Sequence, residues 1–476
     1  MYYKEIAGVK VSALGMGNMR LPTLDGKDDN INREKAQEII DYAMSHGINY
    51  FDTAYRYHGG QSERFIGAAL KAYPRESFYL ASKFPGHMMV KKEGGMVGFT
   101  SGLAGWPDNT VEGVFKEQLD KCQVDYFDFY LLHNMSEQSL TIYDDPDLKV
   151  VDFVKRMKAE GKIRHLGFSS HASSAQTIDD FLTRHEGVFD FVQIQLNYLD
   201  WKLQDAKGKY EAIVKHGLKV VVMEGVRGGR LANLPEEQLA KLQALRPGDS
   251  AARWALRWLQ NLPEVAVVLS GMTTLEQITE NVETFAAPNP LNEEEKALLR
   301  EVADSMLNWV PCTACRYCTE GCPMELEIPK IIAAYNGVKN GDFMARYDPD
   351  TADPSLDPRR CVGCGACASI CPQSIRIPEI LAEFADMLTK RPPFPPRRQN
   401  GIGKQKPGAV RLNSPRCFYH TCQRRIKAIK YKTARKPQQT VRRISAVFFC
   451  VTRAMARGTG IRAMRYRGPL RSQVAP

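Results

Sequence analysis

Short apolar segments alternate with longer segments of helical pattern along residues 1–310. Apolar runs of this kind predict strands. They are Val11–Gly15, Asn49–Asp52, Phe78–Ser82, Phe127–His133, Arg164–Phe168, Phe191–Gln195, Lys219–Met223 and Val265–Ser270. The segments between them predict helices at Arg33–Ser45, Ser62–Ala72, Thr110–Cys122, Lys149–Ala159, Ser174–Arg184, Ala206–Lys215, Ser250–Asn261 and Leu275–Phe285.

Eight strand–helix alternations in about 300 residues are typical of an α/β protein with one closed parallel barrel, the (β/α)8 or TIM fold. The alternative is an open doubly wound sheet, which needs a phosphate-binding glycine loop after an early strand. The nearest candidate, Gly15–Arg20, lacks the third glycine and is not followed at once by a helix. We interpret it as a turn at a strand end. The pattern therefore predicts a barrel over residues 1–310.

One segment breaks the alternation. Met88–Asp108 is rich in Gly and Met, has no helical period and follows the third predicted strand. Active sites of such barrels lie at the carboxyl ends of the strands. This segment is therefore placed either to cover a substrate or to form a plain surface loop.

Eight of the twelve cysteines form two runs of one pattern after the barrel. The first run extends from Cys312 to Pro323 and the second from Cys361 to Pro372, and both read Cys-x2-Cys-x2-Cys-x3-Cys-Pro. At this spacing three cysteines wrap one 4Fe–4S cubane and the fourth turns to a second cubane. Zinc is the alternative metal, but zinc sites use two Cys-x2-Cys pairs and need neither the third cysteine nor the proline. The spacing predicts two 4Fe–4S clusters.

The rule for two-cluster proteins assigns the ligands, because each cluster takes three cysteines of one run and the last cysteine of the other. One set is Cys312, Cys315, Cys318 and Cys371, and the other is Cys361, Cys364, Cys367 and Cys322. A helical stretch around Ile328–Gly337 separates the runs, and Pro392–Pro396 ends the last predicted helix, Pro378–Lys390. We expect a small, mainly helical dicluster domain over residues 311–390.

Composition changes this picture in one respect, the position of the charge. Hydrophobic residues make up 43% of the chain, which is enough for a sizeable core. The net charge is +11, but residues 391–476 hold 22 of the 65 Lys and Arg and no Asp or Glu. Residues 1–390 thus carry 43 basic against 54 acidic residues. The folded part is net acidic, which argues against nucleic-acid binding there.

The basic segment 391–476 has two interpretations. It has the charge to bind RNA or an acidic partner. It also has few aromatic residues and no known module, and we favour a disordered tail. The sequence shows no apolar run of eighteen residues, and Met1–Glu5 has no signal-peptide pattern, so we expect a cytoplasmic protein that does not enter a membrane. Clustered cysteines in such a protein favour metal over disulfides.

Four polar side chains fall at or just beyond the ends of three successive predicted strands. They are Asp52, Tyr57, Lys83 and His133. In a (β/α)8 barrel these strand ends converge on one pocket. An ammonium lowers the pKa of a nearby phenol, so Lys83, held by Asp52, would make Tyr57 a general acid for a carbonyl oxygen. His133 would donate a hydrogen bond to the same oxygen.

These residues resemble the aldo/keto reductase superfamily, and the resemblance covers about residues 4–310. It is also carried by the segments Gly167–His171, Gln193–Tyr198, Gly228–Leu231, Ser270–Thr273 and Gln277–Asn281. The resemblance implies an NAD(P)H-dependent carbonyl reductase with the four polar residues as its catalytic tetrad. The cofactor contacts that it implies are Ser169 and Gln195 for the nicotinamide carboxamide, Gly228 and Gly229 for the pyrophosphate, and Glu280 and Asn281 for the adenine.

Two further features qualify the resemblance. Members that prefer NADPH usually carry basic residues around the stretch Gly271–Gln277, where this chain has no Lys or Arg. A 2′-phosphate would lack a charge-assisted contact there, so a preference for NADPH is not expected. The cysteine runs resemble bacterial dicluster ferredoxins, and the long spacer Met324–Arg360 resembles the helical variety. The whole chain thus resembles a bacterial group of aldo/keto reductases with a C-terminal ferredoxin-type domain.

The two parts pose a problem of electron transfer. Hydride transfer moves two electrons together, a 4Fe–4S cluster passes them singly, and a flavin normally converts one into the other. The sequence shows no flavin-binding fingerprint. The first function that we expect is an iron–sulfur oxidoreductase that reduces a small-molecule carbonyl, or oxidises an alcohol, with electrons exchanged through its clusters with a ferredoxin or flavoprotein partner or a barrel-bound cofactor. The alternatives are an NAD(P)H-dependent reductase with structural or redox-sensing clusters, and a non-catalytic electron-transfer or docking protein.

Overall fold

The computed structural model describes residues 1–100, 106–171, 173–339 and 353–390. The chain divides into two units, Met1–Pro392 and Pro393–Pro476. The second unit lies wholly outside the described residues, and the prediction of a disordered basic tail at 391–476 lies outside them too.

Eight parallel strands of the first unit close into a barrel. In chain order they are β3 (Leu14–Gly17), β4 (Tyr50–Asp52), β5 (Tyr79–Phe84), β9 (Phe127–Leu132), β10 (Ile163–Ser170), β11 (Phe191–Gln195), β12 (Lys219–Met223) and β13 (Val265–Ser270). Strands that follow one another in the chain are neighbours in the barrel, and β13 closes on β3 with Val268 opposite Leu14. The predicted α/β class and the (β/α)8 fold are confirmed.

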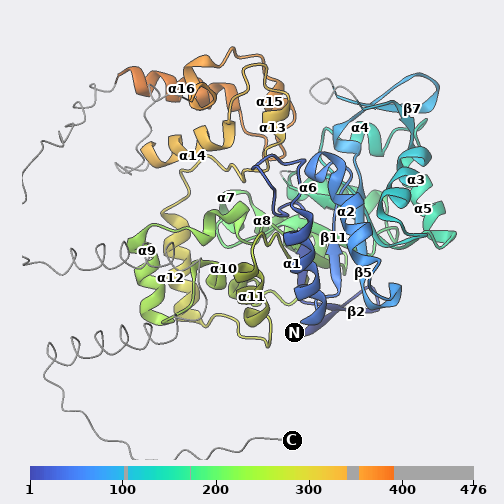
Figure 1. Ribbon diagram of the computed structural model, residues 1–476, viewed down its shortest axis with the longest axis horizontal. Coiled ribbons are helices and arrows are strands. Elements are labelled where there is room, and N and C mark those ends of the chain that lie inside the picture. Colours follow the sequence, from blue (N-terminus) through green and yellow to red (C-terminus); the bar gives the residue numbers. More distant parts are fainter. Residues whose placement is uncertain (101–105, 172, 340–352, 391–476) are drawn as a thin grey trace, which may run out of the picture. The chain divides into compact units, whose positions relative to one another are not determined.

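A helix follows each barrel strand, and in Figure 1 the helices surround the sheet. They are α1 (Arg33–Ser45), α2 (Gln61–Leu70), α3 (Val111–Cys122), α5 (Val150–Ala159), α6 (Ala175–Arg184), α8 (Ala206–Lys215), α10 (Ala251–Leu259) and α11 (Leu275–Thr284). Capping side chains set where helices begin, since Asn32 and Thr110 accept hydrogen bonds from the first turns of α1 and α3. The sequence pattern missed α4 (Leu140–Tyr143), α7 (Asp200–Leu203), α9 (Glu236–Leu245) and α12 (Glu293–Asp304).

Large side chains fill the interior of the barrel. Tyr50, Phe129 and Phe191 form one buried cluster with aliphatic residues of β12 and β13. Space for these rings depends on glycine, because a Cβ on Gly167 would lie 2.7 Å from the Phe191 ring. The barrel is therefore a packed core and not a channel, and a ligand has to bind at its rim.

The amino-terminal segment departs from the prediction. Val11 was predicted to lie in the first barrel strand, but it belongs to an antiparallel hairpin of β1 (Tyr3–Ile6) and β2 (Val9–Ser12), and β3 begins at Leu14. Ile6 and Val11 pack with the interior cluster of the barrel. The apolar run continues from β2 into β3 without a Gly or Pro, so the pattern could not show the bend between them.

The segment Met88–Asp108 is partly built as a sheet. Its strands β6 (Met89–Lys91) and β7 (Met96–Phe99) pair antiparallel, and β8 (Asn109–Thr110) pairs with β7. Trp106 stacks near Tyr55 and Phe99, with ring centroids 5.1 and 5.5 Å apart. The described part of this segment is thus an antiparallel sheet, and its role as a cover for a substrate stays a prediction.

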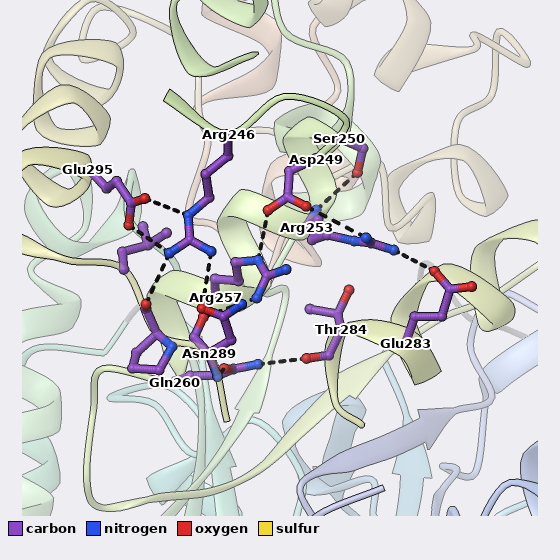
Figure 2. A network of polar contacts seen from close by, with 12 residues as sticks. Arg246, Asp249, Ser250, Arg253, Arg257, Gln260, Glu283, Thr284, Asn289 and Glu295 are labelled. Carbon is purple, nitrogen blue, oxygen red and sulfur yellow. Dashed lines mark hydrogen bonds and ion pairs between the residues drawn. The ribbon is translucent and has the colours of Figure 1, made fainter. Parts of the chain in front are cut away.

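Arginines at the end of α9 and within α10 form a network of polar contacts, as Figure 2 shows. The Arg246 guanidinium donates to both carboxylate oxygens of Glu295, at 2.6 and 2.8 Å. Arg257 donates to Asp249 Oδ2 at 2.8 Å and to the Asn289 carbonyl oxygen at 3.1 Å. These bonds connect α10 and the end of α9 to Asn289 and to Glu295 of α12.

The residues after the barrel form a mainly helical module with a core of its own, coloured yellow to orange in Figure 1. Its helices are α13 (Tyr317–Glu320), α14 (Ile328–Lys339), α15 (Ala366–Ser369) and α16 (Ile377–Thr389), with the 3-10 turns η7 (Pro354–Leu356) and η8 (Pro358–Arg360). Ile331 and Tyr335 of α14 pack in one core with Leu381 and Phe384 of α16. The predicted helical ferredoxin-like domain is confirmed as a fold.

Candidate active site and cluster sites

The four residues predicted as the tetrad lie together at or just beyond the carboxyl ends of β4, β5 and β9. Lys83 Nζ donates to Asp52 Oδ1 at 2.6 Å and to Tyr57 Oη at 3.3 Å. The ring centroids of Tyr57 and His133 are 5.9 Å apart. All four side chains are buried. The structure thus joins a carboxylate, an ammonium, a phenol and an imidazole in one place.

Burial dominates the protonation of this group. Burial lowers the pKa of Lys83 and raises that of Asp52, and their ion pair opposes both shifts. Burial also raises the pKa of Tyr57 well above its usual value, and Tyr317 and Asp52 add to the rise. The net shift is thus opposite in direction to the lowering expected from Lys83, because the lost hydration of the buried phenolate is the largest effect. Tyr57 therefore keeps its proton at neutral pH and can serve as an acid.

Two histidines face each other beside the tetrad. Burial, then the neighbouring His87 and Lys83, holds the pKa of His133 well below its usual value. The ring centroids of His87 and His133 are 4.3 Å apart, and burial lowers the pKa of His87 to about 3. Both rings are therefore neutral at pH 7, and each carries one N–H that can donate to an oxygen. The sequence analysis missed His87, which lies in the turn after β5.

A cavity extends from the tetrad along the rim of the barrel, from Asp52 and Tyr57 to Glu280 and Asn281. Glycines line much of it, namely Gly17, Gly225, Gly228, Gly229 and Gly271. Backbone without side chains lets a ligand approach closely. The structure therefore brings Gly228, Gly229, Glu280 and Asn281 onto one cavity with two members of the tetrad.

The two residues expected at the nicotinamide lie beside this cavity and are not among its lining residues. The Ser169 hydroxyl accepts a hydrogen bond from the Asn134 N–H at 2.8 Å. Gln195 Nε2 donates to Asp200 Oδ2 at 2.7 Å. Gln193, two residues earlier on the same face of β11, lines the cavity instead. Its buried Oε1 has no hydrogen-bond partner within the part of the chain that the structure describes.

Glu224 is a second acid on the cavity that the sequence analysis missed. It directly follows β12, and burial raises its pKa against the opposing effect of Arg20 and Arg227. Its φ of 61° is in the left-handed region, which is rare for a residue with a side chain. The Asn197 Nδ2 and Arg227 N–H donate to its carbonyl oxygen at 3.0 and 2.8 Å and hold that turn. The position of its carboxylate at a strand end could have identified Glu224 from the sequence, as it identified Asp52.

The eight cysteines of the two runs line two separate cavities. Cys312, Cys315, Cys318 and Cys371, which we call the inner set, line one cavity. Cys322, Cys361, Cys364 and Cys367, the outer set, line the other. Among the described residues no group of three or more Cys, His, Asp or Glu closes on a position for a single metal ion. Four thiols around a cavity fit the donor set of a 4Fe–4S cubane.

The inner set lies against the barrel. Cys315 lines the cavity of Tyr57 as well as its own, together with Tyr317 and Pro372 of the module. Arg20, beyond the end of β3, donates to the carbonyl oxygens of Thr313 and Ala314 at 3.2 and 2.8 Å. The module is thus attached to the rim of the barrel at the cavity itself.

These features define an oxidoreductase: a (β/α)8 barrel with an acid–base group at its rim, joined to a cysteine-rich, ferredoxin-like fold. The chain belongs to the aldo/keto reductase family, whose model matches residues 13–304. A second model, the 4Fe-4S dicluster domain, matches residues 311–375. The protein is therefore an aldo/keto reductase with a C-terminal ferredoxin-type domain.

Similar proteins match the barrel part. An uncharacterized oxidoreductase, YqkF, of Bacillus subtilis is 26% identical over 60% of this chain and 92% of its own length. The NADH-specific methylglyoxal reductase of Escherichia coli is 26% identical over 63% of this chain and 96% of its own length. The structure of the aldo-keto reductase AKR11C1 from Bacillus halodurans, in its holo form, aligns with a TM-score of 0.50 and 29% identity, over 63% of this chain and 96% of that one.

No helix among the described residues has the length and apolar character needed to cross a bilayer.

Proposed function

We propose that this protein is an iron–sulfur oxidoreductase that reduces a small-molecule carbonyl, or oxidises the corresponding alcohol, at the Tyr57 end of the cavity. The electrons are exchanged through two 4Fe–4S clusters held by the inner and outer sets. One observation carries the proposal: Cys315, a member of the inner set, lines the same cavity as Tyr57 and Asp52. A cluster ligand and a proton donor on one cavity can serve one bound molecule.

The two sets have the donors that the clusters need. When bound, the cubanes supply or accept electrons one at a time. The N–H of Ala314 donates to Cys312 Sγ at 3.4 Å, and such bonds adjust the potential of a cluster. In the outer set Cys364 is exposed, and the neighbouring Val362 is 61% exposed. A ferredoxin or flavoprotein partner can approach the module there.

The residues of the barrel handle the protons. Reduction of a carbonyl to an alcohol consumes two electrons and two protons. Tyr57 gives one proton to the carbonyl oxygen, and the His133 N–H orients that oxygen. Lys83, anchored by Asp52, stabilises the phenolate that remains. Glu224 lines the same cavity and is an acid available for the second proton.

The cavity also fits a nicotinamide dinucleotide, which supplies a hydride when bound. At one end the unpartnered Gln193 Oε1 can accept from a carboxamide, and at the other end lie Glu280 and Asn281. Arg253, the arginine beside Glu280, is occupied by Glu283 at 2.8 Å and by Glu280 itself at 3.7 Å (Figure 2 shows the Glu283 contact). Because the nearby cation is paired, we propose a preference for NADH over NADPH. The name of the Escherichia coli relative agrees with it.

A second candidate is an NADH-dependent carbonyl reductase whose clusters are structural or redox-sensing. The continuous cavity from Tyr57 to Asn281 favours it. The non-catalytic alternative is not proposed, because a buried ion pair aimed at a buried phenol is costly to keep without a use.

Steady-state rates under anaerobic conditions separate the two candidates. Methylglyoxal is the first carbonyl to test, with NADH, NADPH or a reduced one-electron donor such as ferredoxin. The proteins compared are the wild type, a double variant with Cys315→Ser and Cys364→Ser, and the matched control Cys122→Ser, whose thiol lies in the barrel away from both sets. We expect the one-electron donor to drive reduction in the wild type and the control but not in the double variant. Full activity of the double variant with NADH alone would establish the second candidate.

A further inference from the structure

A chain of hydrogen bonds starts at the carboxyl-terminal ligand of the inner set and enters the barrel. Gln373 lies two residues after Cys371, and its Nε2 donates to Gln195 Oε1 at 2.7 Å. Gln195 Nε2 in turn donates to Asp200 Oδ2 at 2.7 Å. The carboxamide of Gln195, at the end of β11, is thus already held between the module and the barrel.

The series of hydrogen bonds continues from Asp200 to the residue before Cys312, the first ligand of the inner set. Arg227 Nε donates to both carboxylate oxygens of Asp200 at 3.0 Å. Arg227 Nη2 donates to the Pro311 carbonyl oxygen at 3.2 Å, and Pro311 directly precedes Cys312. We call Gln373, Gln195, Asp200 and Arg227 the relay. It connects the two chain segments that carry the ends of the inner set.

The relay is shielded from water. Gln373 is 5% exposed, Gln195 1%, and Asp200 and Arg227 are fully buried. A buried polar group that loses its partner is costly, so a change at one member cannot be compensated by solvent. A displacement at Arg227 therefore has to alter either the Asp200–Gln195–Gln373 bonds or the bond to Pro311.

Arg227 is also the first residue of the segment expected to hold a pyrophosphate. It begins η6 (Arg227–Ala232), in which Gly228 and Gly229 line the long cavity. The module lies directly on this segment, since a Cβ on Gly228 would fall 2.1 Å from the Thr313 carbonyl oxygen. Arg227 itself does not line the cavity, but an anion held at Gly228 lies next in the chain to the relay arginine and beside the inner-set backbone.

We propose that the relay residues are positioning residues that couple occupancy of the long cavity by a dinucleotide pyrophosphate to the reduction potential of the cluster of the inner set. The inference rests on the proposed function. Negative charge beside Arg227 competes for its hydrogen bonds and disfavours an added electron nearby. Binding linkage is reciprocal, so a ligand that lowers this potential must bind less tightly to the reduced protein by the same factor.

The test uses the full-length holoprotein and ADP-ribose, which carries the adenine and the pyrophosphate but lacks the nicotinamide. Redox titration followed by electron paramagnetic resonance gives the potential of each cluster with and without ADP-ribose. Calorimetry gives its Kd for the oxidised and the reduced protein. The titration should show two waves, one for each cluster. We expect ADP-ribose to lower the reduction potential of one cluster and to leave that of the other unchanged. A tenfold weaker Kd in the reduced protein corresponds to a fall of about 59 mV for a one-electron couple.

Two variants show whether the relay carries this effect. Gln373→Ala removes the bond to Gln195 and should reduce the change in Kd at least threefold. Glu320→Gln breaks another contact between module and barrel, the ion pair with Arg56 at 2.6 Å, and should leave the change intact. If Gln373→Ala loses iron, the wild type still tests the coupling, because ADP-ribose should shift the reduction potentials of its two clusters unequally.

The outcomes separate this coupling from the proposed function. Equal shifts of both waves, a Gln373→Ala protein with full coupling, or no binding of ADP-ribose in either state would overturn the coupling and leave the cluster-linked reductase standing. A holoprotein with no pair of one-electron waves would overturn both.

Discussion

The inner and outer sets have the same spacing of cysteines but different surroundings. Each contains one deeply buried thiol, Cys318 in the inner set and Cys367 in the outer. Cys315 of the inner set, however, lines the cavity of Tyr57, whereas Cys364 of the outer set is exposed to solvent. The same cysteine motif thus forms one set beside the cavity and one at the surface, depending on what the neighbouring chain packs against, and the electron route that we propose leads from the surface to the cavity.

The difference follows from the connections of the two runs. The first run comes directly after the barrel, and its backbone carbonyls at Pro311 and Thr313 are bound by barrel arginines. The second run follows η8, where Asp357 caps a turn and pairs with Arg359 at the module surface. A short connection to the barrel therefore determines which set becomes inner.

The largest expected effect separates proton delivery from electron supply. Tyr57→Phe removes the acid but no cluster ligand, and general acid catalysis is worth about 10²–10⁴ in rate. We expect kcat for carbonyl reduction to fall by that factor while iron content stays the same. Tyr55→Phe is the matched control, because Tyr55 Oη binds Glu117 away from the cavity. Loss of iron in the Tyr57 variant, or an unchanged kcat, would contradict the assignment.

The next effect concerns access to the two sets. Mild anaerobic oxidation with ferricyanide should release iron in two phases, each with about half of the total, because two cubanes hold equal iron. The fast phase belongs to the outer set, whose Cys364 is exposed. Iron release followed with a colorimetric chelator measures both phases. A single phase would mean that the inner set is no better shielded than the outer.

A pair of glycines tests the junction of module and barrel. Gly228→Ala would place a Cβ 2.1 Å from the Thr313 carbonyl oxygen, whereas Gly229→Ala meets nothing within 4 Å. Both residues have left-handed φ, so the backbone strain is shared. We expect Gly228→Ala to lower the free energy of unfolding by about 1–3 kcal/mol more than Gly229→Ala. Equal stability in chemical denaturation would argue against close packing there.

The smallest expected effect is a pH dependence of stability that arises from two buried histidines of the barrel. Burial lowers the pKa of His171 to about 4 and that of His87 to about 3, whereas an unfolded histidine titrates near 6.5. The unfolded state binds more protons below that value, so this stability is present above pH 6.5 and is lost as the pH falls toward 4. His87→Gln should flatten the fall of Tm between pH 7 and 4.5, and His46→Gln, an exposed site, should not.

Much of the architecture could be predicted from periodicity and spacing. Eight strands, the helices after them and the two cysteine sets depend on local patterns, and Lys83 and Asp52 meet because barrel strand ends converge. The direction of the pKa shift of Tyr57 could not be predicted, because it depends on burial in the folded chain and on the charge of residues remote in sequence, Tyr317 among them. The contact of Cys315 with the cavity and the bond from Gln373 to Gln195 join the two halves of the chain, and no local pattern encodes them.

A single turnover tests the central claim most directly. Two clusters that each give one electron hold the two electrons that one carbonyl requires. The holoprotein, reduced without nucleotide and freed of excess reductant, is mixed anaerobically with methylglyoxal while cluster spectra and product are followed. We predict loss of both reduced-cluster signals with about one alcohol formed per protein. Clusters that stay reduced, with alcohol appearing only after NADH is added, would contradict the account.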